Sequence, residues 1–214
     1  MTRGVSGRRT PGGMTRGGAG YHSDMTTNSS VHTDADAPVT VPGLDVSEGH
    51  QVAHTLQLRL HALNDLQLTL KHAHWNVVGP TFIGVHTMLD PQIDGVREMV
   101  DVLAERMATL GVSPNGLPGA LVDARTWDDY DVMRADTRAH LGALDLVYDG
   151  IVADHREAID KVGDIDPVTE DILIGQTSDL EQYQWFVRAH LQDAGGALVT
   201  EGADTEEEAA AKAS

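Results

Sequence analysis

Histidine and carboxylate side chains gather between residues 71 and 106, where their types and spacing could bind a metal ion. His86 and Asp90 are four residues apart, and so are Asp101 and Glu105. On a helix, this spacing places the two members of each pair on one face. The eleven residues from Asp90 to Asp101 would cover roughly 16 Å of helix, which is too far for one ion. The pairs are therefore either two separate surface clusters or two halves of a site that a second copy of the chain completes.

His74 is a candidate for a further ligand. It lies near the end of an expected helix, and Gly79 and Pro80 predict a tight turn that brings it close to the start of the next helix. Histidine with Asp and Glu suits iron, zinc or manganese. The chain has no cysteine, which excludes a disulfide framework and a thiolate metal site.

Length and charge exclude several classes of protein. The 214 residues are enough for one domain with a substantial core. The formal net charge of −18 repels nucleic acid and anionic membranes over most of the surface and attracts cations. No apolar run approaches the length of a membrane span, and the N-terminal segment lacks the apolar part of a secretory signal. We therefore expect a cytoplasmic protein without membrane contacts.

Three segments differ in composition. Residues 1–45 are rich in Gly, Ser, Thr, Asp and Pro, so we expect a disordered arm. Its charge is +3 through residue 30, from Arg3, Arg8, Arg9 and Arg16 against Asp24. Met14 and Met25 are alternative starts to Met1, and a start at Met25 removes all four arginines. Residues 46–196 are expected to form the folded domain, and residues 197–214 a disordered acidic tail.

Four long helices are expected, at residues 47–77, 81–110, 131–162 and 167–193. An apolar stripe at helical spacing marks the first of them: Val52, Leu56, Leu60, Leu63, Leu66 and Leu70. Pro91 should kink the second helix or weaken one turn. The Gly- and Pro-rich residues 111–128 form a long connection with room for one helical turn, whereas the other two connections are short. This pattern predicts an all-α four-helix bundle with one long crossover connection, between the second and third helices.

A metal site in the core of such a bundle needs Glu-x-x-His on two helices. No glutamate in this chain has a histidine three residues later. This absence argues against a core site and favours the site between subunits. Two antiparallel copies of the second helix, related by a two-fold axis, would set Asp101 and Glu105 of one copy against His86 and Asp90 of the other. An isologous dimer then has two equivalent sites.

The run HWNVVGPTFIGVHTMLD at residues 74–90, followed by D-x-x-x-E-R at 101–106, resembles the Dps mini-ferritins, the DNA-protection-during-starvation proteins. The resemblance extends from about Val41 to Gly196, includes TWDDY and QWFVRAHL, and is closest to actinobacterial members. It implies a ferritin-like bundle that assembles into a hollow dodecamer. It also implies that ferroxidase ligands fall on five positions: His74, His86 and Asp90 of one subunit, and Asp101 and Glu105 of its partner.

The resemblance implies a function as well. Such a cage oxidises Fe(II), preferably with hydrogen peroxide, at sites that hold two irons each, and it stores the Fe(III) mineral inside. Zinc also fits this ligand set. Trp75, beside His74, would quench stray oxidising equivalents, although a packing role is the more common one for tryptophan. Asp166, Glu170 and Asp171 are candidates for a pore lining, or for helix N-terminal charges that complement the helix dipole.

Competing interpretations remain for several features. The arginine arm could anchor DNA and make the protein a nucleoid-associated DNA-compacting protein, because phosphate binding needs clustered Lys and Arg. A helical oligomer without metal chemistry is a third possibility. A lone histidine on a helix is usually structural or merely exposed, and this is the expected role of the other helical histidines: His54, His61, His72, His140, His155 and His190.

Overall fold

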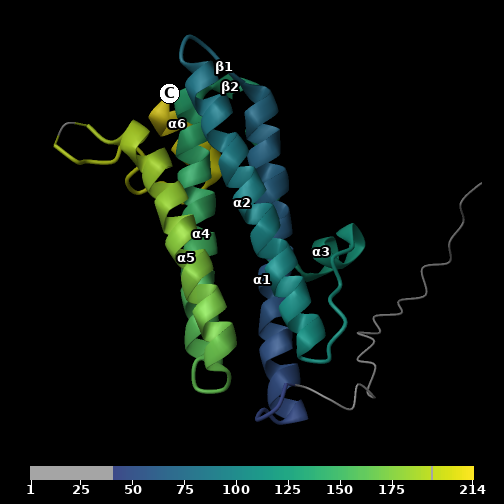
Figure 1. Cartoon of the computed structure of the whole chain (residues 1–214). Coiled ribbons are helices and arrows are strands. Elements are labelled where there is room, and N and C mark those ends of the chain that lie inside the picture. The colour runs from purple at the N-terminus through teal and green to yellow at the C-terminus, as the bar shows by residue number, and fades with distance from the viewer. Residues whose placement is uncertain (1–40, 194) are drawn as a thin grey trace, which may run out of the picture. The chain divides into compact units, whose positions relative to one another are not determined.

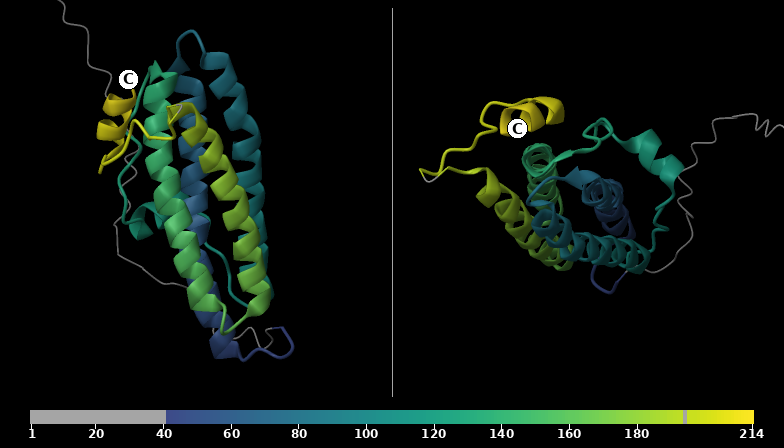
Figure 2. Two further views of the ribbon diagram at one scale, coloured as in Figure 1. Left: turned by 90° about the vertical axis from the view of Figure 1, so that its left-hand side faces the viewer. Right: turned by 90° about the horizontal axis from the view of Figure 1, so that it is seen from above.

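The computed structural model describes residues 41–193 and 195–214. Four long helices lie side by side, as Figures 1 and 2 show. They are α1 (Val46–Asn76), α2 (Phe82–Thr109), α4 (Thr137–Val162) and α5 (Pro167–Leu191). Short turns join α1 to α2 and α4 to α5, whereas the long connection from α2 to α4 contains the short helix α3 (Pro118–Ala124). The predicted four-helix bundle with one crossover is confirmed. Residues 1–40, with the arginines and the alternative starts of the expected arm, lie outside the described residues.

The core forms around the predicted apolar stripe of α1. Val52, Leu56 and Leu63 are completely buried, and the other stripe residues are 1% exposed or less. Burying a leucine fully contributes about 1.5–3 kcal/mol. The burial of this stripe therefore supplies a large part of the free energy that packs the helices of the bundle together. Tyr148 of α4 lies in the same core, and its hydroxyl donates to Oε1 of Gln92 of α2 at 2.7 Å.

Two glycines with a positive φ follow the first two long helices, Gly79 in the turn after β1 (Val77–Val78) and Gly111 just after the end of α2. Gly79 has a φ of 108° and Gly111 a φ of 83°, a region that only glycine enters at little cost. After α2, the N–H of Val112 donates to the carbonyl of Met107 at 3.0 Å, and Gly111 N–H donates to Ala108 at 3.0 Å. These bonds satisfy carbonyl groups that the helix end leaves free. Pro91 does not end α2, which runs through it.

The third long helix begins at Thr137 rather than near residue 131. The preceding residues form the two-residue strand β2 (Ala135–Asp136), which pairs in parallel with β1 (Val77–Val78). Asp136 then caps α4 by accepting a hydrogen bond from the N–H of Ala139 at 2.9 Å. A pairing of two residues leaves no periodic side-chain pattern, which is why the sequence predicts no strand here.

The C-terminal tail differs from the expectation of disorder. Residues Glu206–Ala213 form the helix α6, which packs on α4. Ala209, Ala210 and Ala213 are buried there. Alanine is a strong helix former, and α4 presents Gly142 at the contact, so two helix backbones can approach closely. The sequence does not predict that this helix packs on the bundle, because the tail has few large apolar residues and each small side chain buries little area.

None of the helices among the described residues is both long enough and apolar enough to cross a membrane.

Candidate metal centre

The end of α1 and the start of α2 bring His74 and His86 together. The turn at Gly79 and Pro80 reverses the chain between the two helices, so residues twelve apart become neighbours. The two imidazole rings are stacked, with centroids 3.6 Å apart and planes 22° apart. The predicted proximity of His74 to the second helix is therefore confirmed.

Two reciprocal hydrogen bonds fix the orientation of these rings. The Nδ1 atom of His74 lies 2.9 Å from the carbonyl oxygen of His86, and Nδ1 of His86 lies 2.9 Å from the carbonyl oxygen of His74. A carbonyl oxygen only accepts, so each Nδ1 carries a proton, and Nε2 is the ring nitrogen that is left to bind a metal ion. Within residues 41–193 and 195–214, neither Nε2 atom has a hydrogen-bond partner. Metal-binding histidines are commonly oriented in this way.

Asp90 lies beside the two rings. Its Oδ1 accepts from the Lys71 ammonium at 3.1 Å and is 3.4 Å from Nδ1 of His74. The hydrogen bond from Lys71 lowers the pKa of the Asp90 carboxyl, and the nearby His74 and His86 lower it further. Asp90 is therefore ionised at neutral pH, half-exposed, and partly neutralised by a lysine that sequence reasoning missed. The signal was available, because Lys71 precedes His74 by three residues and shares its helix face.

Asp101 and Glu105 are placed apart from this group. Both side chains are exposed on α2, further along the helix by the distance that the sequence spacing predicts. In the part of the chain that the structure describes, their carboxylates have no hydrogen-bond or ion-pair partner. No group of three His, Cys, Asp or Glu side chains in this same part could hold a metal ion. One subunit thus presents two separate groups, one of His74, His86 and Asp90, in which His74 is buried, and one of the exposed Asp101 and Glu105. The assignment of these five residues as ligands stays a prediction.

Trp75 points away from the core. Its side chain is 71% exposed, so it does not pack within its own subunit. Trp185 on α5 is 60% exposed. Trp185 therefore does not belong to the core of its own subunit.

Three of the histidines expected to be structural are buried. His155 is completely buried, and burial, aided by the Arg59 charge, lowers its pKa to about 4. His140 is also completely buried, and its Nδ1 is 3.0 Å from the hydroxyl of Tyr130. His61 is buried, with Nε2 3.0 Å from the amide of Gln57. Their neutral, buried rings fit the structural interpretation.

Asp166 has a structural role within the subunit. Its carboxylate caps α5 by accepting from the N–H of Val168 at 3.3 Å, and it pairs with Arg106 at 2.6 Å. The interpretation of Asp166 as a helix N-terminal charge is therefore favoured over a pore lining. Asp171 is exposed, and Glu170 is half-buried.

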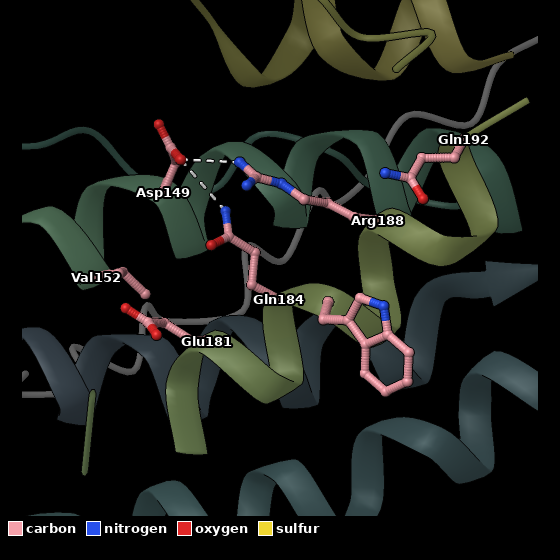
Figure 3. A pocket seen from close by; sticks show the side chains of 7 residues that line it. Asp149, Val152, Glu181, Gln184, Arg188 and Gln192 are labelled. Carbon is pink, nitrogen blue, oxygen red and sulfur yellow. Dashed lines mark hydrogen bonds and ion pairs between the residues drawn. The ribbon is translucent and has the colours of Figure 1, made fainter. Parts of the chain in front are cut away.

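A hollow of about 370 Å³ lies between α4 and α5. Figure 3 shows the Arg188 and Gln184 side chains reaching toward Asp149. Arg188 Nη2 is 2.9 Å from Asp149, and Arg188 Nε is 2.6 Å from Asp145. Asp149 is thus already paired with Arg188 and Gln184, and none of the five predicted ligands lines this hollow.

A four-helix bundle with one long crossover connection is the architecture of the ferritin-like class of proteins, and this bundle also gathers histidine and carboxylate side chains on its first helix pair. The ferritin-like domain family matches residues 53–196. The DNA protection during starvation protein of Mycolicibacterium smegmatis is 57% identical over 174 residues, which are 81% of this chain and 95% of that protein. The fine tangled pili major subunit of Haemophilus ducreyi is 52% identical over 174 residues, or 81% of this chain and 90% of that protein.

A solved structure of another Dps protein has a similar fold. DpsA14 from Streptomyces coelicolor superposes with a TM-score of 0.74 at 62% sequence identity, covering 75% of this chain and 96% of that chain. The chain belongs to the Dps family of ferritin-like proteins.

Proposed function

We propose that this protein oxidises Fe(II) at a di-iron site shared between two subunits and stores the Fe(III) product inside a dodecameric cage. The observation that carries the proposal is the stacked pair His74 and His86, whose two Nε2 atoms have no hydrogen-bond partner among the described residues. Such a pair is oriented for metal ions, yet Asp90 is the one carboxylate beside it, and a complete site needs further carboxylates.

The partner subunit would supply those carboxylates. Asp101 and Glu105 are exposed on the same helix that carries His86 and Asp90. In a two-fold dimer with antiparallel α2 helices, each copy offers its carboxylates to the histidines of the other, and two equivalent sites result. Two imidazole nitrogens and three carboxylates are suitable ligands for two iron ions.

The chemistry of such a site is a two-electron step. Two Fe(II) ions each give one electron to hydrogen peroxide, which with two protons becomes two molecules of water. Pairing the electrons avoids the hydroxyl radical that one-electron reduction of peroxide releases. The carboxylates stabilise the higher charge of Fe(III), and the neutral imidazoles hold the Fe(II) substrate before oxidation. Trp75, exposed next to His74, would give up an electron to a stray oxidant.

Protection of DNA would then follow from the removal of Fe(II) and peroxide together. The relative from M. smegmatis carries DNA protection in its name. The acidic surface of this chain, at a net charge of −18, favours attraction of Fe(II) over phosphate binding. DNA compaction through the arginine arm is the second candidate. A gel shift over a salt series, with and without residues 1–24, separates the two functions.

Iron oxidation is tested by adding Fe(II) anaerobically to the oligomer, then peroxide, and recording the Fe(III) absorbance. The Asp101→Ala and Glu105→Ala variants should lose most of the rate. Asp160→Ala is the matched control, because Asp160 is an exposed carboxylate on α4, away from α2. An absence of Fe(III) absorbance in the unmodified protein, or full rates in both α2 variants, contradicts the proposal. Prior loading with Zn(II), which suits the same ligands, should inhibit the reaction.

A further inference from the structure

Two polar contacts tie α2 to α5, and they bracket the carboxylates Asp101 and Glu105. On one side, Arg106 donates from Nη2 to Oδ2 of Asp166 at 2.6 Å and from Nε to the hydroxyl of Thr169 at 3.0 Å. On the other side, the amide of Gln176 donates to the carbonyl oxygen of Met99 at 3.1 Å. Among the described residues, these are the side-chain hydrogen bonds that join the two helices.

The contact between Arg106 and Asp166 is buried, and several hydrogen bonds hold it. The side chains of Arg106 and Asp166 are 10% and 7% exposed. The Thr169 hydroxyl donates to the same carboxylate oxygen, Oδ2 of Asp166. Burial alone would raise the pKa of Asp166, but the hydrogen bonds from Arg106 and Thr169 outweigh it, and the pKa is lowered. Several hydrogen bonds hold this buried ion pair in a single arrangement of the two side chains, whereas an ion pair on the surface can adopt many.

These contacts control how α2 is rotated about its own axis. Met99 and Arg106 are seven residues apart, so they share the helix face that meets α5. Asp101 and Glu105 share a different face, which is exposed. The contacts at Met99 and Arg106 hold one face of α2 against α5. They therefore also determine the direction in which the carboxylates of Asp101 and Glu105 point. Apolar contacts with α1 hold α2 in the bundle, but they tolerate small rotations more readily than a buried ion pair does.

We propose that Arg106, held by Asp166 and Thr169, and Gln176 are positioning residues for the carboxylate half of the shared metal site. The inference rests on the proposed function, since it deepens the account of that site. Shared sites need this control more than sites within one subunit, because the two ligand sets meet only across an interface. A small rotation of α2 would move both carboxylates away from the partner's histidines at once.

The test uses Co(II) as a spectroscopic probe in the intact oligomer. Arg106→Gln and Gln176→Leu should each weaken Co(II) binding by about 10–100-fold, as the loss of supporting residues around metal ligands typically does. The visible spectrum of bound Co(II) should shift as carboxylate ligation is lost. Iron oxidation should show a raised KM with a smaller change in kcat. Arg156→Gln is the matched control, because it breaks the exposed pair between Arg156 of α4 and Glu181 of α5 and should change none of these.

Hydrogen exchange of the metal-free oligomer provides a second measurement that does not depend on iron chemistry. The amides of residues 101–105 should exchange faster in Arg106→Gln and Gln176→Leu, while those of α1 keep the rates of the unmodified protein. Unchanged exchange and unchanged Co(II) affinity in both variants would overturn the positioning role. If the unmodified oligomer binds no Co(II), the proposed function fails instead, and the exchange rates still decide whether these contacts hold the α2 segment.

Discussion

His74 and His86 each donate their Nδ1 proton to the backbone carbonyl of the other, at 2.9 Å in both directions. The arrangement joins the end of α1 to the first turns of α2 and leaves both Nε2 atoms free to bind metal. The same two residues therefore close the turn between the helices and present the Nε2 atoms that we propose as metal ligands.

Replacement of His86 by alanine should weaken metal binding at the histidine half of the proposed site. The variant removes one Nε2 ligand, and it also removes the ring that stacks on His74 and donates to the His74 carbonyl. Co(II) affinity should fall by at least about tenfold, measured by calorimetry on the oligomer. His54→Ala, an exposed histidine on α1, is the control and should bind normally. Equal affinity in the two variants would contradict the ligand assignment.

Lys71 should compete with metal ions for Asp90. Its ammonium donates to Oδ1 of Asp90 at 3.1 Å and must move when a cation binds there. Lys71→Met should tighten Co(II) binding by less than about tenfold, because the pair is half-exposed and screened by solvent. Lys161→Met, which breaks the exposed pair with Glu157 on α4, serves as the control. Weaker binding in Lys71→Met would mean that the lysine supports the site rather than competing for it.

The docking of α6 should depend on pH through Glu206. Burial, with the nearby carboxylates of Asp65, Asp131 and Asp128, raises the pKa of Glu206 to about 7. A carboxyl group whose pKa is raised on folding stabilises the folded form when protonated, and it loses this contribution as the pH rises from 4.5 through about 7. The amides of α6 should therefore be better protected at pH 5 than at pH 8, after correction for intrinsic exchange.

Glu206→Gln should remove this dependence and protect α6 at pH 8. The gain should be about tenfold or less in the docking equilibrium, since solvent screens part of the repulsion. Glu207→Gln, an exposed neighbour on the same helix, should leave the dependence intact. Protection that does not vary with pH in the unmodified protein would contradict the prediction.

Gly142 should be essential for the contact between α4 and α6. A Cβ atom at this position would lie 2.6 Å from the carbonyl oxygen of Ala209 and 2.9 Å from Cβ of Ala213. Gly142→Ala should therefore release α6 while the bundle stays folded, and proteolysis in residues 197–205 should become faster. At Gly150, also on α4, an added Cβ meets nothing within 4 Å. Gly150→Ala should keep α6 docked and stabilise α4 by about 0.5–1 kcal/mol. Equal cleavage rates in the two variants would refute the role of Gly142.

The sequence predicts the bundle well because its signals are local. The leucine spacing of α1 and the glycines at residues 79 and 111 specify helix faces and ends without tertiary information. The fold of α6 depends instead on a partner surface. Its alanines bury little area alone, and only the gap at Gly142 on α4 makes their close approach favourable. The β1–β2 pair likewise depends on backbone groups brought together by the crossover.

The candidate site likewise has features that the sequence predicts and features that depend on tertiary structure. The spacing of His86, Asp90, Asp101 and Glu105 along one helix follows from the sequence, and so does the separation of the two pairs. The reciprocal bonds between His74 and His86, and the partnership of Lys71 with Asp90, depend on how α1 and α2 are set against each other. The contact of Arg106 with Asp166 joins residues 60 apart in the chain, and no local pattern predicts it.

Subunit complementation tests the shared site most directly. One chain carries His74→Ala and His86→Ala, and a differently tagged chain carries Asp101→Ala and Glu105→Ala. Each alone should assemble and be inactive. In a mixed dimer, the intact histidines of the second chain meet the intact carboxylates of the first, so one of the two sites is restored.

Random co-assembly should therefore recover about a quarter of the unmodified rate of Fe(II) oxidation by peroxide, because about half of the dimers are mixed and each has one working site. If the ligands came from a single subunit, no mixed dimer could have an intact site. Mixed oligomers that are as inactive as their parents would contradict the account.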